Sequence, residues 1–180
     1  MNTATKETWQ VILSGVGGQG LMLAGNLLGK AALYEGKKAV MTSAYGVETR
    51  GTFTKSDVII SGAEIDFPEV GQADAVIALD VIAYKKYADS LGEESLLIYD
   101  DSIDYLPSKA GQAGFPVSKI AKETGNPSAS NIAALGILVK LTGIVAEESI
   151  RNAIREEFKD KEAAAKQNLA AFEASLTYCK

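Results

Sequence analysis

The segment Gly15-Val16-Gly17-Gly18-Gln19-Gly20 separates an apolar run, residues 9–14, from a stretch in which Leu, Ala and Met recur at helical spacing, residues 21–34. Glycines permit positive φ and place no Cβ between the main chain and a ligand, while the N–H groups and dipole of a following helix attract negative charge. The pattern therefore predicts a strand, a glycine turn and a helix. It makes Gly15, Gly17, Gly18, Gln19 and Gly20 candidates for contact with a phosphate-bearing ligand. Tight strand-to-helix packing without any ligand stays open as the alternative.

A dinucleotide site needs more than these glycines. It also needs an acidic residue about 20 positions later, at the end of the second strand, to hold the ribose hydroxyls. Here the second predicted strand, residues 37–42, runs into Ser43-Ala44-Tyr45-Gly46, and Glu48 is the first acid to follow. An NAD site therefore stays open without support. A Walker-type loop is excluded, because no Gly-Lys-Ser/Thr follows the glycines.

Composition predicts one domain over residues 1–180, with 47% hydrophobic residues and a formal net charge of −5. The negative charge and the lack of a basic run argue against nucleic-acid binding. The polar start of the chain does not have the apolar core of a signal peptide, and no apolar stretch is long enough for a membrane span. We therefore expect a cytoplasmic protein that does not bind membranes.

The chain contains a single cysteine, Cys179, and no histidine. Thiolate- or imidazole-based metal sites consequently have almost no ligands here, and the chain cannot hold an iron–sulfur cluster by itself. Nucleophilic systems that pair histidine with serine or cysteine are excluded as well. The sequence thus predicts neither a metal site nor a catalytic residue.

A polar loop, residues 43–52, follows the second predicted strand. Tyr45, Gly46, Glu48 and Arg50 belong to it, and a strand end is where an open α/β sheet places groups that contact ligands. The guanidinium of Arg50 suits phosphate or carboxylate groups. A solvated surface loop is the open alternative.

The remaining segments predict a three-layer, Rossmann-like α/β domain with a mostly parallel sheet, some antiparallel strands and C-terminal helices. Partial alternation over residues 53–65 favours two short strands in a hairpin, and residues 73–80 and 95–100 read as buried strands. Asp80 is expected to cap a helix, and residues 104–114 to form a polar connection. Asn131 precedes a long apolar helix, residues 132–141, as a cap or a ligand contact, and the small residues Ala133, Ala134 and Gly136 of this helix should allow close packing.

Two motifs in this order, Gly-Val-Gly-Gly-Gln-Gly over residues 15–20 and Tyr-Gly-Val-Glu-Thr-Arg-Gly over residues 45–51, resemble the gamma subunit of 2-oxoacid:ferredoxin oxidoreductases. The resemblance continues through residues 74–79, 120–121, 131–136 and 168–172, and so covers nearly the whole chain. Enzymes of this family oxidise pyruvate, 2-oxoglutarate or branched 2-oxoacids to acyl-CoA.

The resemblance implies a subunit that is inactive alone and that contributes to coenzyme A handling and complex assembly, with 2-oxoglutarate as the preferred substrate. Thiamine diphosphate would belong to the alpha and beta subunits, and iron–sulfur clusters to the beta subunit and a ferredoxin-like delta subunit, with ferredoxin as the acceptor. Two alternatives stay open: an assembly module without ligand contacts, and a free-standing NAD(P)-binding oxidoreductase. A homodimer of the isolated chain is also open, and we expect exposed apolar surface near the two loops.

Overall fold

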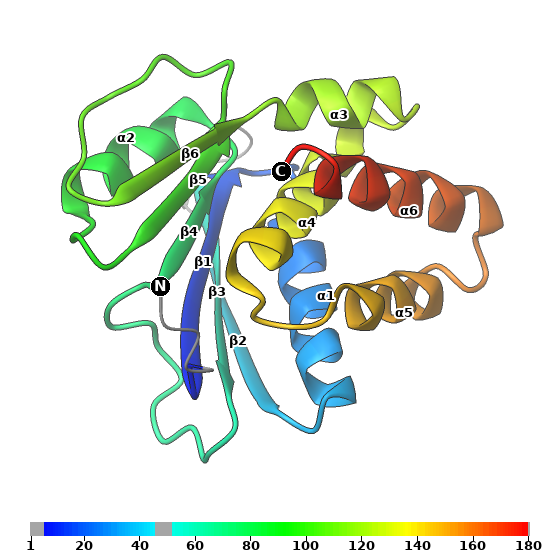
Figure 1. The fold of residues 1–180 in the computed structure, drawn as a ribbon, viewed down its shortest axis with the longest axis horizontal. Helices are drawn as coiled ribbons and strands as arrows, with labels where there is room; N and C mark the ends of the chain where they lie inside the picture. Colours follow the sequence, from blue (N-terminus) through cyan, green and yellow to red (C-terminus); the bar gives the residue numbers. More distant parts are fainter. Residues whose placement is uncertain (1–5, 46–51, 180) are drawn as a thin grey trace.

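The structure is a computed structural model that describes residues 6–45 and 52–179. Its centre is a six-stranded sheet in the order β2-β3-β1-β4-β5-β6 (Figure 1). The strands are β1 (Thr8–Val16), β2 (Lys38–Tyr45), β3 (Phe53–Ser61), β4 (Ala75–Ala78), β5 (Leu96–Asp100) and β6 (Gly111–Phe115). β1, β4, β5 and β6 pair in parallel, whereas β3 is antiparallel to both of its neighbours, β1 and β2. The predicted α/β fold, with a mostly parallel sheet and some antiparallel pairing, is confirmed.

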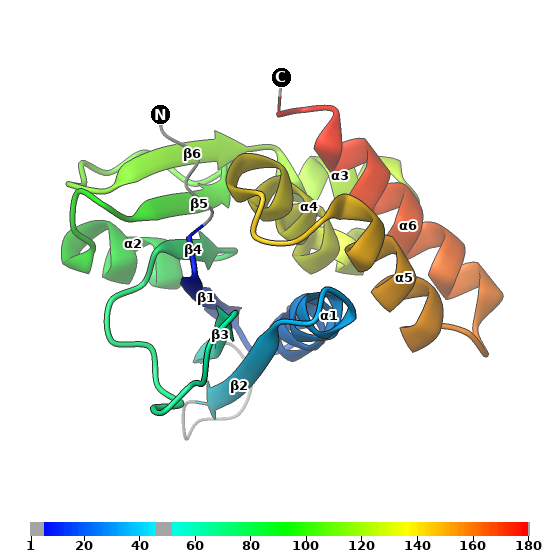
Figure 2. The same cartoon turned by 60° about the horizontal axis from the view of Figure 1, so that its bottom comes forward.

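Helices cover both faces of the sheet and produce the predicted three layers (Figures 1 and 2). They are α1 (Leu21–Tyr34), α2 (Val81–Ser90), α3 (Val117–Glu123), α4 (Ser130–Thr142), α5 (Glu147–Glu157) and α6 (Glu162–Leu176). α2 packs on one face against β1, β4 and β5, while α1, α3 and α4 pack against strands on the other. α5 and α6 form an outer row on α1 and α4. No helix in the described part of the chain could serve as a membrane span.

Side chains that alternate along β1 divide the core between these two faces. Val11 and Leu13 are buried in the larger cluster with α1 and α4, whereas Ile12 is buried in the smaller cluster with α2. Successive residues of a strand point to opposite faces, so a strand covered on both sides reads as a continuous apolar run. The run over residues 9–14 therefore reflects a central strand.

The predicted hairpin over residues 53–65 is wrong. β3 is one long strand, and it forms a hairpin with the preceding strand, β2, while its other edge pairs with β1. β2 also extends beyond the predicted end at residue 42, and Tyr45 is its last residue. Pairing with β3 accounts for this extension, because the register between the two strands continues without a break to Tyr45, which lies opposite Thr54.

β6 is the strand that the sequence did not predict, since its residues were expected to form a polar connection. Gly114 lies beneath the ring of Tyr99, where a Cβ would approach the ring carbon Cζ to 2.9 Å. Glycine at this position therefore allows the close approach of an aromatic ring. The weak β-propensity of the segment explains why the sequence did not predict a strand here.

Two local predictions are confirmed. The side chain of Asp80 caps α2 by accepting a hydrogen bond from the main-chain N–H of Ile82 at 2.9 Å. The small residue Gly136 allows close packing of α4 on α6, because a Cβ there would lie 2.1 Å from Oγ of Ser175. Helix capping and helix contact thus follow directly from the sequence at these positions.

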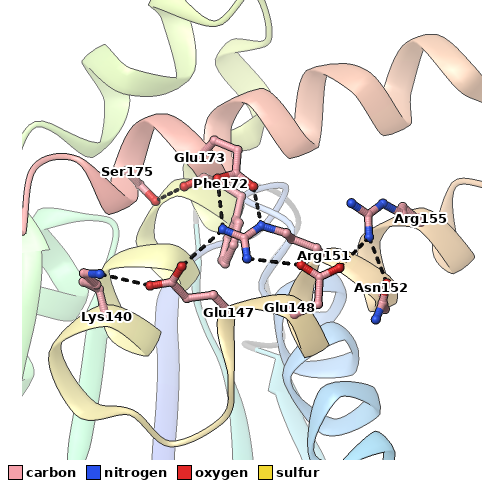
Figure 3. A network of polar contacts seen from close by, with 9 residues as sticks. All are labelled: Lys140, Glu147, Glu148, Arg151, Asn152, Arg155, Phe172, Glu173 and Ser175. Carbon is pink, nitrogen blue, oxygen red and sulfur yellow. Dashed lines mark hydrogen bonds and ion pairs between the residues drawn. The ribbon is translucent and has the colours of Figure 1, made fainter.

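An ion-pair network centred on Arg151 joins α5 to α6 (Figure 3). Arg151 donates from Nε and Nη2 to the two carboxylate oxygens of Glu173, at 2.6 and 3.1 Å, and lies over the ring of Phe172. It also pairs with Glu147 and Glu148 at the start of α5, and Glu147 in turn accepts from Lys140 of α4. Bidentate geometry makes the Arg151–Glu173 contact the strongest of these pairs.

Replacement of Arg151 by methionine should lower the free energy of unfolding by about 1–2 kcal/mol, since several partly exposed ion pairs and a ring contact are lost. The midpoint of thermal unfolding should fall by roughly 2–8 °C. Arg155→Met is the matched control, because Arg155 is more exposed and pairs only with Glu148 among the described carboxylates. Equal effects of the two changes in thermal denaturation would contradict a special role for Arg151.

Stability should also fall in acid through Glu147. The hydrogen bond from Lys140, assisted by Arg151, holds the pKa of the Glu147 carboxyl below its ordinary value of 4.5. A carboxyl with a depressed folded-state pKa stabilises the fold above the unfolded-state pKa and loses this contribution as the pH falls. Chemical denaturation should show the free energy of unfolding of the wild type decreasing more steeply below about pH 4.5 than that of Glu147→Gln.

Candidate functional site

The glycine turn connects β1 to α1. It lies at the end of the sheet where the parallel strands β1, β4, β5 and β6 have their carboxyl ends, which we call the carboxyl edge. Gly18 and Gly20 have φ values of 97° and 70°, which glycine adopts readily and other residues do not. Gly17 and Gly18 are exposed, and a Cβ on Gly17 would find only Oγ1 of Thr54, at 3.9 Å, within reach. The outer side of the turn is therefore open main chain, accessible to a ligand or to another protein.

Gln19, predicted as a ligand contact, has a structural role within the turn. Its Oε1 accepts from the main-chain N–H of Val16 at 2.8 Å, and its Nε2 donates to the carbonyl of Leu79 at 3.0 Å. Gly15 makes room for this side chain, since a Cβ there would lie 2.1 Å from Oε1 of Gln19. These contacts fasten the turn to the end of β4, and a ligand contact of either residue stays a prediction.

Asn131 reaches the turn from α4, 111 positions along the chain. Its Nδ2 donates to the carbonyl of Gly20 at 2.8 Å, and its Oδ1 accepts from the N–H of Ile132 at 2.9 Å. A Cβ on Gly20 would lie 2.4 Å from Nδ2 of Asn131, so this glycine is needed for the contact as well as for its φ. The structure thus unites Asn131 with the glycine turn, although its 3% exposure leaves it beneath the surface.

The second predicted motif begins at the same edge. Tyr45 is the last residue of β2, and Gly46, Glu48 and Arg50 lie outside the described residues. Residues 46–51 connect β2 to β3, and the N–H of Gly17 donates to the carbonyl of Thr52 at 3.2 Å. The hairpin therefore brings the end of this loop directly against the glycine turn.

Exposed apolar side chains, which the sequence analysis did not single out, accompany the turn. Met22 in the first turn of α1 and Val81 and Ile82 in the first turn of α2 are 43%, 43% and 49% exposed. Gln19 links the two helix starts through Leu79. The apolar residues that directly follow the capping Asp80 in the sequence were the signal from which these exposed side chains could have been predicted. These side chains put exposed apolar groups beside the turn, and a contiguous apolar patch near the loops stays a prediction.

The described residues hold no cluster of metal-ligating side chains. Among the described residues, no three His, Cys, Asp or Glu side chains form a group that could hold a metal ion. Cys179 is half-buried, and burial raises the pKa of its thiol, which disfavours the reactive thiolate. What the described residues offer here is exposed main chain at Gly17 and Gly18 and exposed apolar side chains, which suit binding.

Comparisons with known proteins identify relatives that match nearly the whole chain. The chain is 40% identical to 2-oxoglutarate synthase subunit KorC of Methanocaldococcus jannaschii over 177 residues, which cover 95% of this chain and 94% of the relative. The gamma subunit of a keto/oxoacid ferredoxin oxidoreductase from Geobacter sulfurreducens PCA superposes with a TM-score of 0.85 at 34% identity, covering 97% of both chains.

A third comparison concerns the fold alone, because the identity is 22%. A 2-oxoglutarate:ferredoxin oxidoreductase from Magnetococcus marinus, solved with 2-oxoglutarate, coenzyme A and succinyl-CoA bound, matches with a TM-score of 0.86. The match covers 97% of this chain and 31% of that one.

The family match itself extends over residues 10–178 and includes the glycine turn, the hairpin and Asn131. The chain belongs to the pyruvate ferredoxin/flavodoxin oxidoreductase family, in which it is the gamma-type, non-catalytic subunit of a 2-oxoacid:ferredoxin oxidoreductase.

Proposed function

We propose that this subunit belongs to a 2-oxoglutarate:ferredoxin oxidoreductase and that its carboxyl edge contacts coenzyme A in the assembled enzyme. The observation that supports this most directly is the open main chain at Gly17 and Gly18, which lies against Thr52, the residue that directly follows the segment containing Arg50. Phosphate groups bind well to exposed main chain at a helix N-terminus and to guanidinium groups.

The contribution of this chain would be to position a substrate. Coenzyme A carries phosphates, a long uncharged arm and a terminal thiol, so contacts at the glycine turn would hold the phosphate end. The thiol would then extend to a reaction centre on other subunits. Gain in rate would come from orientation and electrostatic complementarity, without a covalent step on this chain.

The relatives support the proposed substrate and partners. The similarity to a 2-oxoglutarate synthase subunit favours 2-oxoglutarate over pyruvate and branched 2-oxoacids. The structure from Magnetococcus marinus has coenzyme A bound, which makes coenzyme A the first ligand to test. The proposed partners are alpha and beta subunits with thiamine diphosphate and iron–sulfur clusters, a ferredoxin-like delta subunit, and ferredoxin as acceptor.

The strand order argues against the alternative of an NAD(P)-dependent oxidoreductase. In a dinucleotide-binding sheet the second strand lies next to the first, so that an acid at its tip reaches the ribose. Here β3 separates β1 from β2, which moves the tip of β2 about 9–10 Å from the turn. The described end of β2 also carries no acid.

The alternative of an assembly module without ligand contacts has support of its own. Met22, Val81 and Ile82 are exposed in the isolated chain, as expected for apolar side chains that a partner subunit buries on assembly. Gly15 and Gly20 make room for side chains of this chain, so these two glycines are explained without a ligand. A partner subunit that covers the carboxyl edge would use the same open turn. Ligand and partner contact must therefore be separated by experiment.

Gly17 offers this separation, because an added side chain there meets open space. In the assembled enzyme, Gly17→Asp should raise the KM for coenzyme A about tenfold through charge repulsion with phosphate, while the KM for 2-oxoglutarate stays constant. Gly17→Asn, of nearly equal size but uncharged, is the matched control and should have a much smaller effect. The assay is coenzyme A-dependent oxidation of 2-oxoglutarate with a low-potential dye.

The contrary result is equally clear. If Gly17→Asp weakens assembly and leaves the KM for coenzyme A at the wild-type value, the assembly module is the correct alternative. Arg50→Gln tests the loop in the same assay and should also raise the KM for coenzyme A. Gly15→Ala serves as a folding control, since its Cβ would collide with Gln19 and lower the stability of the isolated subunit.

A further inference from the structure

Two main-chain donors of the glycine turn lie on either side of Gln19. The N–H groups of Gly17 and Gln19 donate to carbonyl groups of this chain, whereas those of Gly18 and Gly20 meet no acceptor among the described residues. Gly18 and Gly20 are also exposed. A phosphate that binds this turn therefore finds its donors at these two glycines. Their direction depends on what fixes the main chain between them.

The side chain of Gln19 fixes the main chain there, because its amide is bonded at both ends. Its Oε1 accepts from the N–H of Val16 at 2.8 Å, and its Nε2 donates to the carbonyl of Leu79 at 3.0 Å. One group must accept and donate at once, which neither a carboxylate nor an apolar side chain of similar length can do. Both polar atoms of Gln19 are thus engaged within the chain.

Asn131 holds the far end of the turn with the same chemistry. Its Nδ2 donates to the carbonyl of Gly20, and its Oδ1 accepts from the N–H of Ile132. Asn131 is 3% exposed, so it acts from beneath the surface. Two amide side chains therefore fasten the turn, one to the end of β4 and one to the start of α4.

We infer that Gln19 and Asn131 are positioning residues for coenzyme A. They hold the turn in the shape that presents the N–H groups of Gly18 and Gly20, and they act through the main chain without touching the ligand. The inference rests on the proposed function, since coenzyme A is the ligand at the turn. Donors that are fixed in advance gain affinity, because the ligand does not have to order them on binding.

The test compares variants in the assembled enzyme, at saturating concentration of this subunit. Gln19→Met and Asn131→Leu keep the approximate size of the side chain and remove the amide. Each should raise the KM for coenzyme A about fivefold, the effect of one lost hydrogen bond. The kcat and the KM for 2-oxoglutarate should stay at the wild-type values, because the coenzyme, once bound, reacts at a centre on other subunits.

Asn168 is the matched control for an amide with a structural role alone. It lies in α6 at 5% exposure, and its Nδ2 donates to the carbonyl of Ala164 at 2.9 Å. Asn168→Leu should lower the melting temperature of the isolated chain, as both turn variants should, and leave the KM for coenzyme A unchanged. An equal rise of this KM in all three variants would overturn the inference, because general loss of stability would explain it.

Main-chain amide signals of the ligand-free chain in nitrogen–proton NMR spectra separate positioning from direct contact. The signal of Gly18 should move in Asn131→Leu, and that of Gly17 in Gln19→Met, since the turn changes shape before any ligand is present. Neither glycine adjoins the changed residue in the sequence. A raised KM with both signals unmoved would overturn the inference in favour of direct contact with coenzyme A.

Failure of the inference differs from failure of the proposed function. If Gly17→Asp raises the KM for coenzyme A and the two amide variants do not, the coenzyme binds at the turn but Gln19 and Asn131 do not position it. If Gly17→Asp also leaves this KM at the wild-type value, the coenzyme does not bind at the turn, and the proposed function and the inference are both wrong.

Discussion

The antiparallel insertion of β3 between β1 and β2 is the constraint on which the rest of this structure depends. It turns the second strand of an otherwise parallel arrangement into an edge strand and joins it to β3 by a short hairpin connection. The hairpin must then return at the carboxyl edge, beside the first turn of the chain. At this edge the N–H of Gly17 donates a hydrogen bond to the carbonyl of Thr52, just before β3 begins.

The elements that the sequence predicted well are those with one dominant local signal. The buried strand before Asp80, the capping by Asp80 itself and the close contact at Gly136 follow from apolar runs, a capping oxygen and a small side chain. β6 was missed because its pattern is set by the ring of Tyr99 on the neighbouring strand. The hairpin was misplaced because continuous apolar residues in β3 do not reveal which neighbour pairs with them.

The candidate site divides in the same way. The glycine turn and the loop were recognised from their residues, but only the fold shows that Gly15 and Gly20 serve Gln19 and Asn131, and that Gly17 and Gly18 face outward. Contacts across 60 and 111 positions fix these roles. No local spacing encodes such contacts, so a glycine pattern alone cannot separate packing from binding.

The larger core has a consequence for synthesis of the chain. Its side chains extend from Val11 in the first strand to Phe172 in the last helix, and they form one cluster. α1 packs against α5, so the first helix lacks part of its cover until the C-terminal residues have left the ribosome. Completion of the fold is therefore a late event, and the nascent N-terminal half exposes apolar surface on which a chaperone could act.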